Sequence, residues 1–239
     1  MSTPSGTKQE RQGEWLPLLF LFLLALDILL GWLRLDEWRY VSKPLLMPVL
    51  LIWFLLQAGV MRPRLKGLVA AALIFSWLGD IFLMLEAKNS LFFMLGLGAF
   101  LLAHVCYIFF FYRLMHYLGT QIKSWIAILL LAYYGFLLYL LTPHLDGLLW
   151  PVRIYGLVIS VMLLLAAHFA FAGIGRAGRE MAIGALLFVV SDSVLAINKF
   201  YYSFNAAGAI VMLTYGLAQL FIIGGILLYL RQAAPRGEE

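Results

Sequence analysis

The sequence predicts an all-α fold, a bundle of helices that crosses a membrane several times. Of the 239 residues, 64% are hydrophobic and only 12% are charged, whereas soluble domains average about 45–50% apolar and about 25% charged residues. The apolar residues form runs of about 20, the length that spans a hydrocarbon core as a helix. The segments between these runs are short, so we expect a single transmembrane domain over residues 15–230.

Eight transmembrane helices are expected between the clusters of charge. The first run is followed by no Ala-x-Ala-like cleavage site, so we expect it to be a retained helix. In the second, Pro44 is expected in the first turn, where its missing N–H is not needed, and Lys43 would then lie at the outer mouth. The expected spans are 16–33, 44–61, 67–85, 91–112, 124–142, 152–173, 180–197 and 207–230. Residues 1–14 are expected to form a disordered tail and residues 231–239 a C-terminal tail.

The lysines and arginines are distributed unevenly between the two sides of the predicted bundle. Eleven fall on the side of the chain termini and six on the other side. Because cytoplasmic loops carry the excess of Lys and Arg, both termini are expected in the cytoplasm. This topology accounts for the net charge of +5, so no nucleic-acid partner is expected. We expect a multi-pass protein of the cell membrane, or of the inner membrane if the source is bacterial.

Two aspartates lie inside apolar runs. Asp80 and Asp192 each face an insertion cost of about 2.5–3.5 kcal/mol, which makes an intramembrane carboxylate a functional hypothesis by default. Asp80 follows the start of its span by about 13 residues, roughly 20 Å at 1.5 Å per residue. The site is therefore expected in the outer half of the bilayer. Asp27, near the outer end of the first span, is open to two interpretations: a site role, or a carboxylate that reaches the surface or pairs with Arg34.

The two halves of the chain align as a repeat. Asp192 follows Asp80 by 112 positions, and Arg153 follows Lys43 by 110. Lys43 and Arg153 are each expected at the start of a helix beside a proline. Four spans separate equivalent positions, so the repeats, about 15–120 and 121–230, are expected to have the same orientation. Both aspartates would then approach a central axis at equal depth, with Lys43 and Arg153 flanking the outer mouth.

This arrangement favours acid–base chemistry. Two neighbouring carboxylates cannot easily both ionise, so the pair can hold one proton near neutral pH. One then acts as a general acid and the other as a base or electrostatic stabiliser, which suits cleavage through an oxocarbenium-like cation. The single cysteine excludes a multi-cysteine metal site, and we expect neither a metal nor an organic cofactor. The other candidate residues, expected to bind an anionic head group, line the cavity or bridge helices, are Lys43, His104, Arg153, Asn198, Lys199, Tyr215 and Gln219.

Four segments together resemble the YhhN-type membrane lysoplasmalogenases: Gly79-Asp80-x-Phe-Leu-Met, Ser191-Asp192-x-x-Leu-Ala-x-Asn198-Lys199-Phe, Ser42-Lys43-Pro-Leu and Tyr215-Gly-Leu-Ala-Gln219. The resemblance covers about residues 15–230. It implies a multi-pass hydrolase that cleaves the vinyl ether bond of a lysoplasmalogen. The products would be a fatty aldehyde and glycerophosphoethanolamine or glycerophosphocholine. The two acidic positions of the family correspond to Asp80 and Asp192.

Two other classes of protein use intramembrane aspartates. Intramembrane aspartyl proteases resemble Tyr-Asp plus Gly-x-Gly-Asp, but Ser191 stands in place of the tyrosine and the first glycine is missing here. A proton-coupled transporter of a lipid or amphiphile would also suit a repeat with membrane carboxylates. The two helices that carry the aspartates contain no mid-span proline, so the broken-helix signal of such transporters is absent from them.

Overall fold

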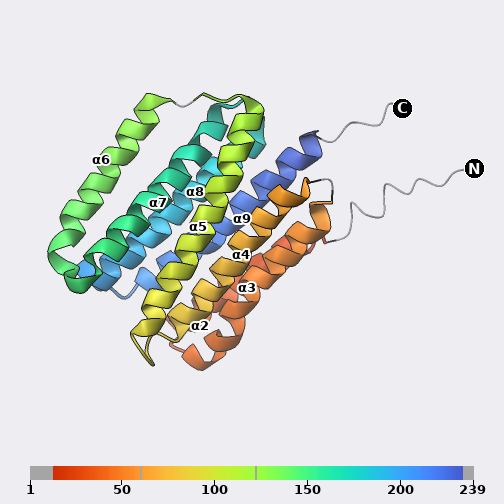
Figure 1. Ribbon diagram of the computed structural model, residues 1–239. Coiled ribbons are helices and arrows are strands. Elements are labelled where there is room, and N and C mark those ends of the chain that lie inside the picture. Colours follow the sequence, from red (N-terminus) through yellow and green to blue (C-terminus); the bar gives the residue numbers. More distant parts are fainter. Residues whose placement is uncertain (1–12, 60, 122, 234–239) are drawn as a thin grey trace, which may run out of the picture.

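Helices are the only regular secondary structure in the residues that the computed structural model describes, which are 13–59, 61–121 and 123–233. They run alternately up and down, so the two described chain ends lie at the same end of the bundle (Figure 1). The predicted all-α fold is confirmed. The long helices are α2 (Leu16–Trp32), α3 (Asp36–Gln57), α4 (Pro63–Met84), α5 (Leu91–Leu118), α6 (Ser124–Leu141), α7 (Leu149–His168), α8 (Gly175–Ala196) and α9 (Ala207–Ala233). Shorter elements are the 3₁₀ segments η1 (Thr142–His144), η2 (Asp146–Leu148) and η3 (Phe169–Phe171) and the π-helix η4 (Ile197–Tyr201).

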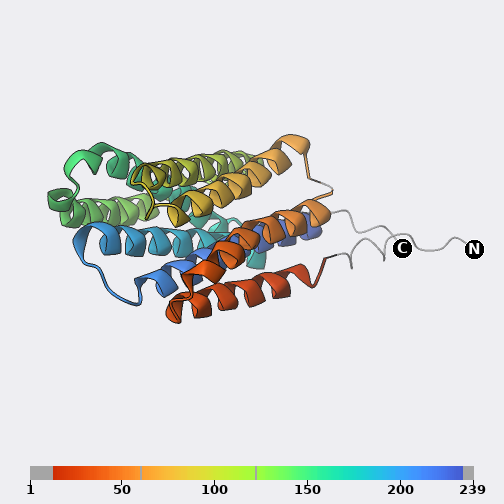
Figure 2. The same cartoon turned by 90° about the horizontal axis from the view of Figure 1, so that it is seen from below.

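Seven of the described helices are long and apolar enough to cross a membrane, and the chain is an integral membrane protein. The remaining apolar helix, α2, has 17 residues and is shorter than the usual span, so the eighth crossing stays a prediction. The central span belongs to α9: 56% of an apolar 18-residue stretch of this helix is buried, against only 11% of the corresponding stretch of α6. Figure 1 accordingly shows α6 at one edge of the bundle, and Figure 2 shows the red helix α2 at another edge.

The predicted tails fall mostly outside the described residues. Of the segment expected to be disordered, only Gly13 and Glu14 are described, and they form a turn that leads into α2. The last helix was expected to end at residue 230, but α9 continues through Arg231 to Ala233. A basic residue in the last turn is favourable there, because it faces the unpaired carbonyl groups of the helix end.

The prediction that the second helix opens at Pro44 is wrong. Helix α3 begins at Asp36, and its first turn carries Asp36 and Glu37, whose negative charges are favourable at a helix N-terminus. Both Pro44 and Pro48 therefore lie inside the helix. Because Pro48 has no N–H, the carbonyl of Pro44 loses its helical partner, and the indole Nε1 of Trp77 on α4 donates to that carbonyl at 2.8 Å.

Glycines allow the central helices to approach each other closely. A Cβ atom on Gly184 of α8 would lie 2.7 Å from both the carbonyl oxygen of Ala218 and the amide nitrogen of Ile222 on α9. One on Gly225 of α9 would lie 2.8 Å from the carbonyl of Ala177. Backbone thus meets backbone at two levels, the kind of contact that small residues permit between membrane helices.

We predict that Gly184→Ala lowers the melting temperature of the detergent-solubilised protein. The added methyl group meets backbone atoms, which cannot rotate away, and overpacking of this kind costs about 1–3 kcal/mol. Gly135→Ala on α6 is the matched control, because a Cβ there meets nothing within 4 Å. Equal melting curves for the two variants would contradict the close α8–α9 packing.

Candidate functional site

Asp80 is almost completely buried, with 2% of its surface exposed, and its carboxylate has two partners. The Nζ atom of Lys43 on α3 lies 3.7 Å from its Oδ1. The hydroxyl of Tyr215 on α9 donates to its Oδ2 at 2.8 Å. The extension of α3 to Asp36 puts Lys43 inside the helix, and this position lets the ammonium reach the carboxylate. Lys43 was expected at the outer mouth of the second helix, but it pairs with the buried Asp80.

Asp192 has a different set of partners. The hydroxyl of Tyr155 on α7 donates to its Oδ2 at 2.5 Å, and the Nε2 atom of the buried His104 on α5 lies 3.8 Å from the same oxygen. Neither ring nitrogen of His104 has a hydrogen-bond partner within the described residues. The side chain of Asp192 is 15% exposed, so it is the more accessible of the two carboxylates.

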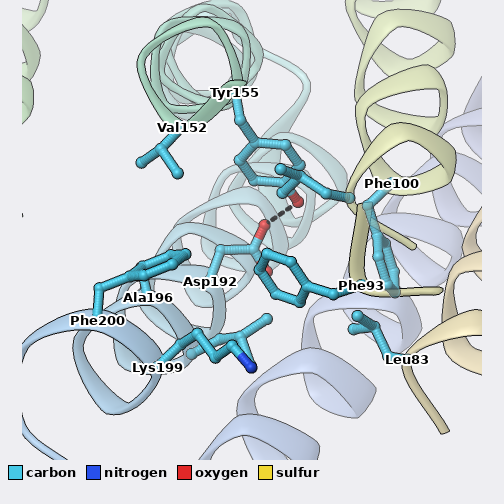
Figure 3. Close-up of a pocket in the computed structure, with 11 residues that line it drawn as sticks. Leu83, Phe93, Phe100, Val152, Tyr155, Asp192, Ala196, Lys199 and Phe200 are labelled. Carbon is cyan, nitrogen blue, oxygen red and sulfur yellow. Dashed lines mark hydrogen bonds between the residues drawn. The ribbon is translucent and has the colours of Figure 1, made fainter. Parts of the chain in front are cut away.

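Asp192 lines an open pocket of about 460 Å³, which we call the Asp192 pocket. Figure 3 shows the carboxylate of Asp192 hydrogen-bonded to Tyr155 and surrounded by aromatic and aliphatic side chains. Apart from Tyr155, Asp192 and Lys199, every lining residue is apolar, and Asp80 is not among them. The apolar lining consists of Leu83, Phe93, Leu97, Phe100, Val152, Leu195, Ala196 and Phe200. A ligand that fits this lining has a long apolar chain and one reactive polar bond that can lie beside the Asp192 carboxylate.

A layer of aromatic rings lies between the partners of the two aspartates. The ring of Phe188 is 4.6 Å from that of His104 and 5.4 Å from that of Tyr215. Phe100, which lines the Asp192 pocket, contacts Tyr215 edge-on at 5.6 Å. Each carboxylate therefore has its own donors, and Asp80 sits behind the wall of the pocket. A proton shared directly between the two carboxylates stays a prediction.

One partner of Asp80 and one partner of Asp192 are separated by the same 112 positions as the aspartates themselves. Adding 112 to Lys43 gives Tyr155, so the offset converts the pair Lys43–Asp80 into the pair Tyr155–Asp192. The sequence alignment matched Lys43 with Arg153 instead, and the offset of the aspartates was the signal that pointed to Tyr155. The guanidinium of Arg153 lies over the ring of Trp150 at 5.6 Å, and Arg153 does not line the Asp192 pocket.

Lys199 lines the pocket and pairs with Glu86, a residue of the α4–α5 turn that the sequence did not single out. The π-helix η4 carries Lys199 beyond the end of α8, and the ammonium lies 5.0 Å above the ring of Phe93. Its neighbour Asn198 has a local role, because its Oδ1 accepts the backbone N–H of Phe204 at 3.0 Å. Of these two predicted residues, Lys199 alone lines the pocket.

Tyr215 and Gln219, predicted either to line the cavity or to bridge helices, bridge helices. Both are buried, and neither lines the Asp192 pocket. The amide of Gln219 donates to Ser76 of α4 at 2.9 Å and accepts from the hydroxyl of Tyr107 of α5 at 2.7 Å. Together they tie α9 to α4 and α5.

Asp27 does not reach the surface or pair with Arg34. It is fully buried, and its carboxylate accepts from Ser42 at 2.8 Å and from Arg39 at 3.4 Å. Within the described residues, no group of three or more His, Cys, Asp or Glu side chains is arranged to hold a metal ion.

Comparison with known proteins places these residues in a family. The sequence profile of the YhhN family matches residues 38–226. The chain belongs to the YhhN family. The matched range contains Lys43, both membrane aspartates, Tyr155 and Lys199.

The chain is similar to curated relatives over most of its length. Mouse lysoplasmalogenase TMEM86B is 32% identical over 209 residues, which cover 84% of this chain and 83% of the mouse protein. Bovine lysoplasmalogenase TMEM86A is 32% identical over 188 residues, 74% of this chain and 73% of that protein. A lysoplasmalogenase of Mycobacterium tuberculosis is 30% identical over 174 residues, 70% of this chain and 64% of that protein. No solved structure shows significant similarity.

For this YhhN protein we predict that Lys43→Met lowers stability more than the double variant Lys43→Met/Asp80→Asn does. The single change leaves a buried carboxylate without its cation, which typically costs about 3–5 kcal/mol. The double change removes both charges together. Thermal unfolding in detergent measures the difference. If the double variant melts no higher than the single one, the Lys43–Asp80 pair is not the source of the stability.

Proposed function

We propose that this protein is a lysoplasmalogenase, a membrane hydrolase that cleaves the vinyl ether bond of a lysophospholipid. The observation that carries the proposal is the Asp192 pocket, where one accessible carboxyl group faces an apolar lining with a cation at its edge. Membership of a family whose curated relatives are named lysoplasmalogenases supports the same reaction. The products are a fatty aldehyde and glycerophosphoethanolamine or glycerophosphocholine.

The lining suggests how the substrate binds. The alkenyl chain packs among the apolar side chains, and its far end continues through the open side of the pocket into the surrounding lipid. The phosphate binds the ammonium of Lys199, which has three N–H donors and pairs with Glu86. The uneven distribution of Lys and Arg puts this end of the bundle on the outer side, so we place the reaction in the outer half of the bilayer.

The proposed reaction adds one molecule of water. The carboxyl group of Asp192, in its protonated form, donates its proton to the vinyl carbon remote from oxygen, which leaves an oxocarbenium ion. The resulting carboxylate takes a proton from water as that water attacks the carbon bonded to oxygen. The carboxylate's gain of a proton from water regenerates the acid for the next turnover. The hemiacetal that forms then collapses: its hydroxyl proton passes to the glycerol oxygen, the carbon–oxygen bond to the glycerol breaks, and the aldehyde and the glycerophospho alcohol separate.

Tyr155 and His104 position this group. The short hydrogen bond from the Tyr155 hydroxyl fixes one carboxyl oxygen, so the other is directed to the substrate. His104 lies against the bonded oxygen and against the ring of Tyr155, 5.4 Å away between centroids. A preorganised donor such as the Tyr155 hydroxyl stabilises developing charge without moving during the reaction.

Asp80 is the second aspartate of the proposal. Its hydrogen bond holds Tyr215, which contacts Phe100 of the pocket wall. We therefore assign Asp80 a supporting role. It helps to shape the wall of the Asp192 pocket, and it contributes to the electrostatic environment of the oxocarbenium ion. Asp192 carries the proton.

We predict that Asp192→Asn loses about 100-fold to 10,000-fold of the hydrolysis rate, the range that general acid–base catalysis contributes. Asp80→Asn should lose less, because its carboxylate lies behind the wall. Release of aldehyde from an alkenyl lysophosphatidylethanolamine measures both. Asp146→Asn, a surface change in η2, is the control. Full activity of folded Asp192→Asn would contradict the proposal. Full activity of Asp80→Asn would show that Asp80 has no part in the reaction.

We also predict that Lys199→Gln raises KM for the lysolipid about tenfold with little change in kcat. The ammonium binds the phosphate equally in the ground state and the transition state, so its loss weakens binding uniformly. Lys88→Gln on the exposed α4–α5 turn is the matched control. An unchanged KM for Lys199→Gln would place the head group elsewhere.

A further inference from the structure

A second pocket, of about 340 Å³, lies between α2, α3 and α9. It is the more polar of the two, and we call it the Arg39 pocket. Its charged residues are Asp27 and Arg39, and Asn205 contributes an amide. The remaining lining residues are Ile28, Gly31, Trp32, Gly208, Ala209 and Met212.

The guanidinium of Arg39 has spare hydrogen-bonding capacity. It donates to Asp27 and Asp36 over the long distances of 3.4 and 3.5 Å. Its Nε is buried and has no partner within the described residues. The side chain is 26% exposed, so ligand oxygens can reach it from the pocket. A guanidinium carries five N–H donors in a fixed fork, and the bonds to the two carboxylates use only one donor on each terminal nitrogen.

Two glycines shape this pocket. A Cβ on Gly31 would lie 3.2 Å from the central carbon of the Arg39 guanidinium, so the glycine lets that group lie against the backbone of α2. A Cβ on Gly208 would meet nothing within 4 Å. The glycine at the start of α9 therefore leaves the pocket open.

One wall of the Arg39 pocket is equivalent to one wall of the Asp192 pocket in the other half of the chain. Three residues of α5 line the Asp192 pocket, and the residues 112 positions later, on α9 and in the turn before it, line the Arg39 pocket. These pairs are Phe93 and Asn205, Leu97 and Ala209, and Phe100 and Met212. The side chains on α5 are large and apolar, whereas Asn205 and Ala209 are small or polar. Equivalent positions of the two halves thus form an apolar wall in one pocket and a more polar wall in the other.

We infer that the Arg39 pocket binds the phosphodiester group of a glycerophospholipid head group. The fork of an arginine matches phosphate oxygens in bidentate geometry. The first turn of α9 adds N–H groups that favour an anion, and the amide of Asn205 adds a further donor. Asp27 is fully buried and already accepts from Ser42 and Arg39, so it holds the guanidinium in place and is not presented to a cation. This site is independent of the proposed hydrolysis.

The test counts lipids bound to the purified full-length protein by native mass spectrometry. The probe is the ester lysophosphatidylethanolamine, which has no vinyl ether bond, so binding is measured without turnover. Gly208→Leu fills the pocket with a side chain, and we expect it to bind one lipid fewer than the wild type at saturation. Gly98→Leu on α5 is the matched control, since a Cβ there also meets nothing within 4 Å and Gly98 lines neither pocket.

Arg39→Lys is the second variant, because it keeps the charge beside Asp27 and loses the fork. We expect about tenfold weaker binding of the lipid at this site, the loss of about one charge-assisted hydrogen bond. Competition by glycerophosphoethanolamine separates a site that recognises the phosphodiester alone from one that also requires the acyl chain. Wild-type lipid counts and affinities in both Gly208→Leu and Arg39→Lys would overturn the inference. So would an equal loss of lipid in Gly98→Leu.

Discussion

The bundle depends on one constraint: a carboxylate placed among apolar helices must find its donors on neighbouring helices. Unpaired, such a group is strongly destabilising, and no water is present in the hydrocarbon layer to compensate. Asp80 satisfies the requirement through Lys43 and Tyr215, which come from α3 and α9. Asp27 satisfies it through Ser42 and Arg39 of α3. The rotation and depth of these helices are therefore set by polar contacts as well as by packing.

The same requirement is met differently at Asp192, and the difference accounts for its accessibility. Asp80 has a cation and a hydroxyl for partners and is sealed. Asp192 has the neutral hydroxyl of Tyr155 and, at 3.8 Å, an imidazole. Where a lysine would neutralise the carboxylate, a tyrosine leaves its proton chemistry available. One half of the chain thus buries its carboxylate beside a cation, and the other presents one to a pocket.

The sequence was sufficient for features that depend on local composition. The apolar runs predicted the helices, and the two aspartates stood out because ionisable residues are costly there. The start of α3 was missed because Pro44 looked like a first-turn residue, and the compensating bond from Trp77 comes from another helix. Tyr155, Glu86 and the pairing of Asp27 with Arg39 were missed for a related reason. Their partners are 12 to 113 positions away, and which faces of two helices meet cannot be read from either helix alone.

The hydrogen bond between Tyr107 and Gln219 joins the two halves of the chain. These residues are 112 positions apart, the same offset that relates the two aspartates, so equivalent positions of the two halves touch each other. Asp80 of the first half bonds Tyr215 of the second, and His104 of the first half lies against Asp192 of the second. The position equivalent to Tyr215 is Ala103, the neighbour of His104. Contacts between equivalent positions, such as that of Tyr107 with Gln219, occur on the axis of a two-fold symmetric dimer. Two identical chains would place the same side chain on both sides of such an axis. Within one polypeptide the two positions can differ, and here a tyrosine hydroxyl donates and a glutamine oxygen accepts.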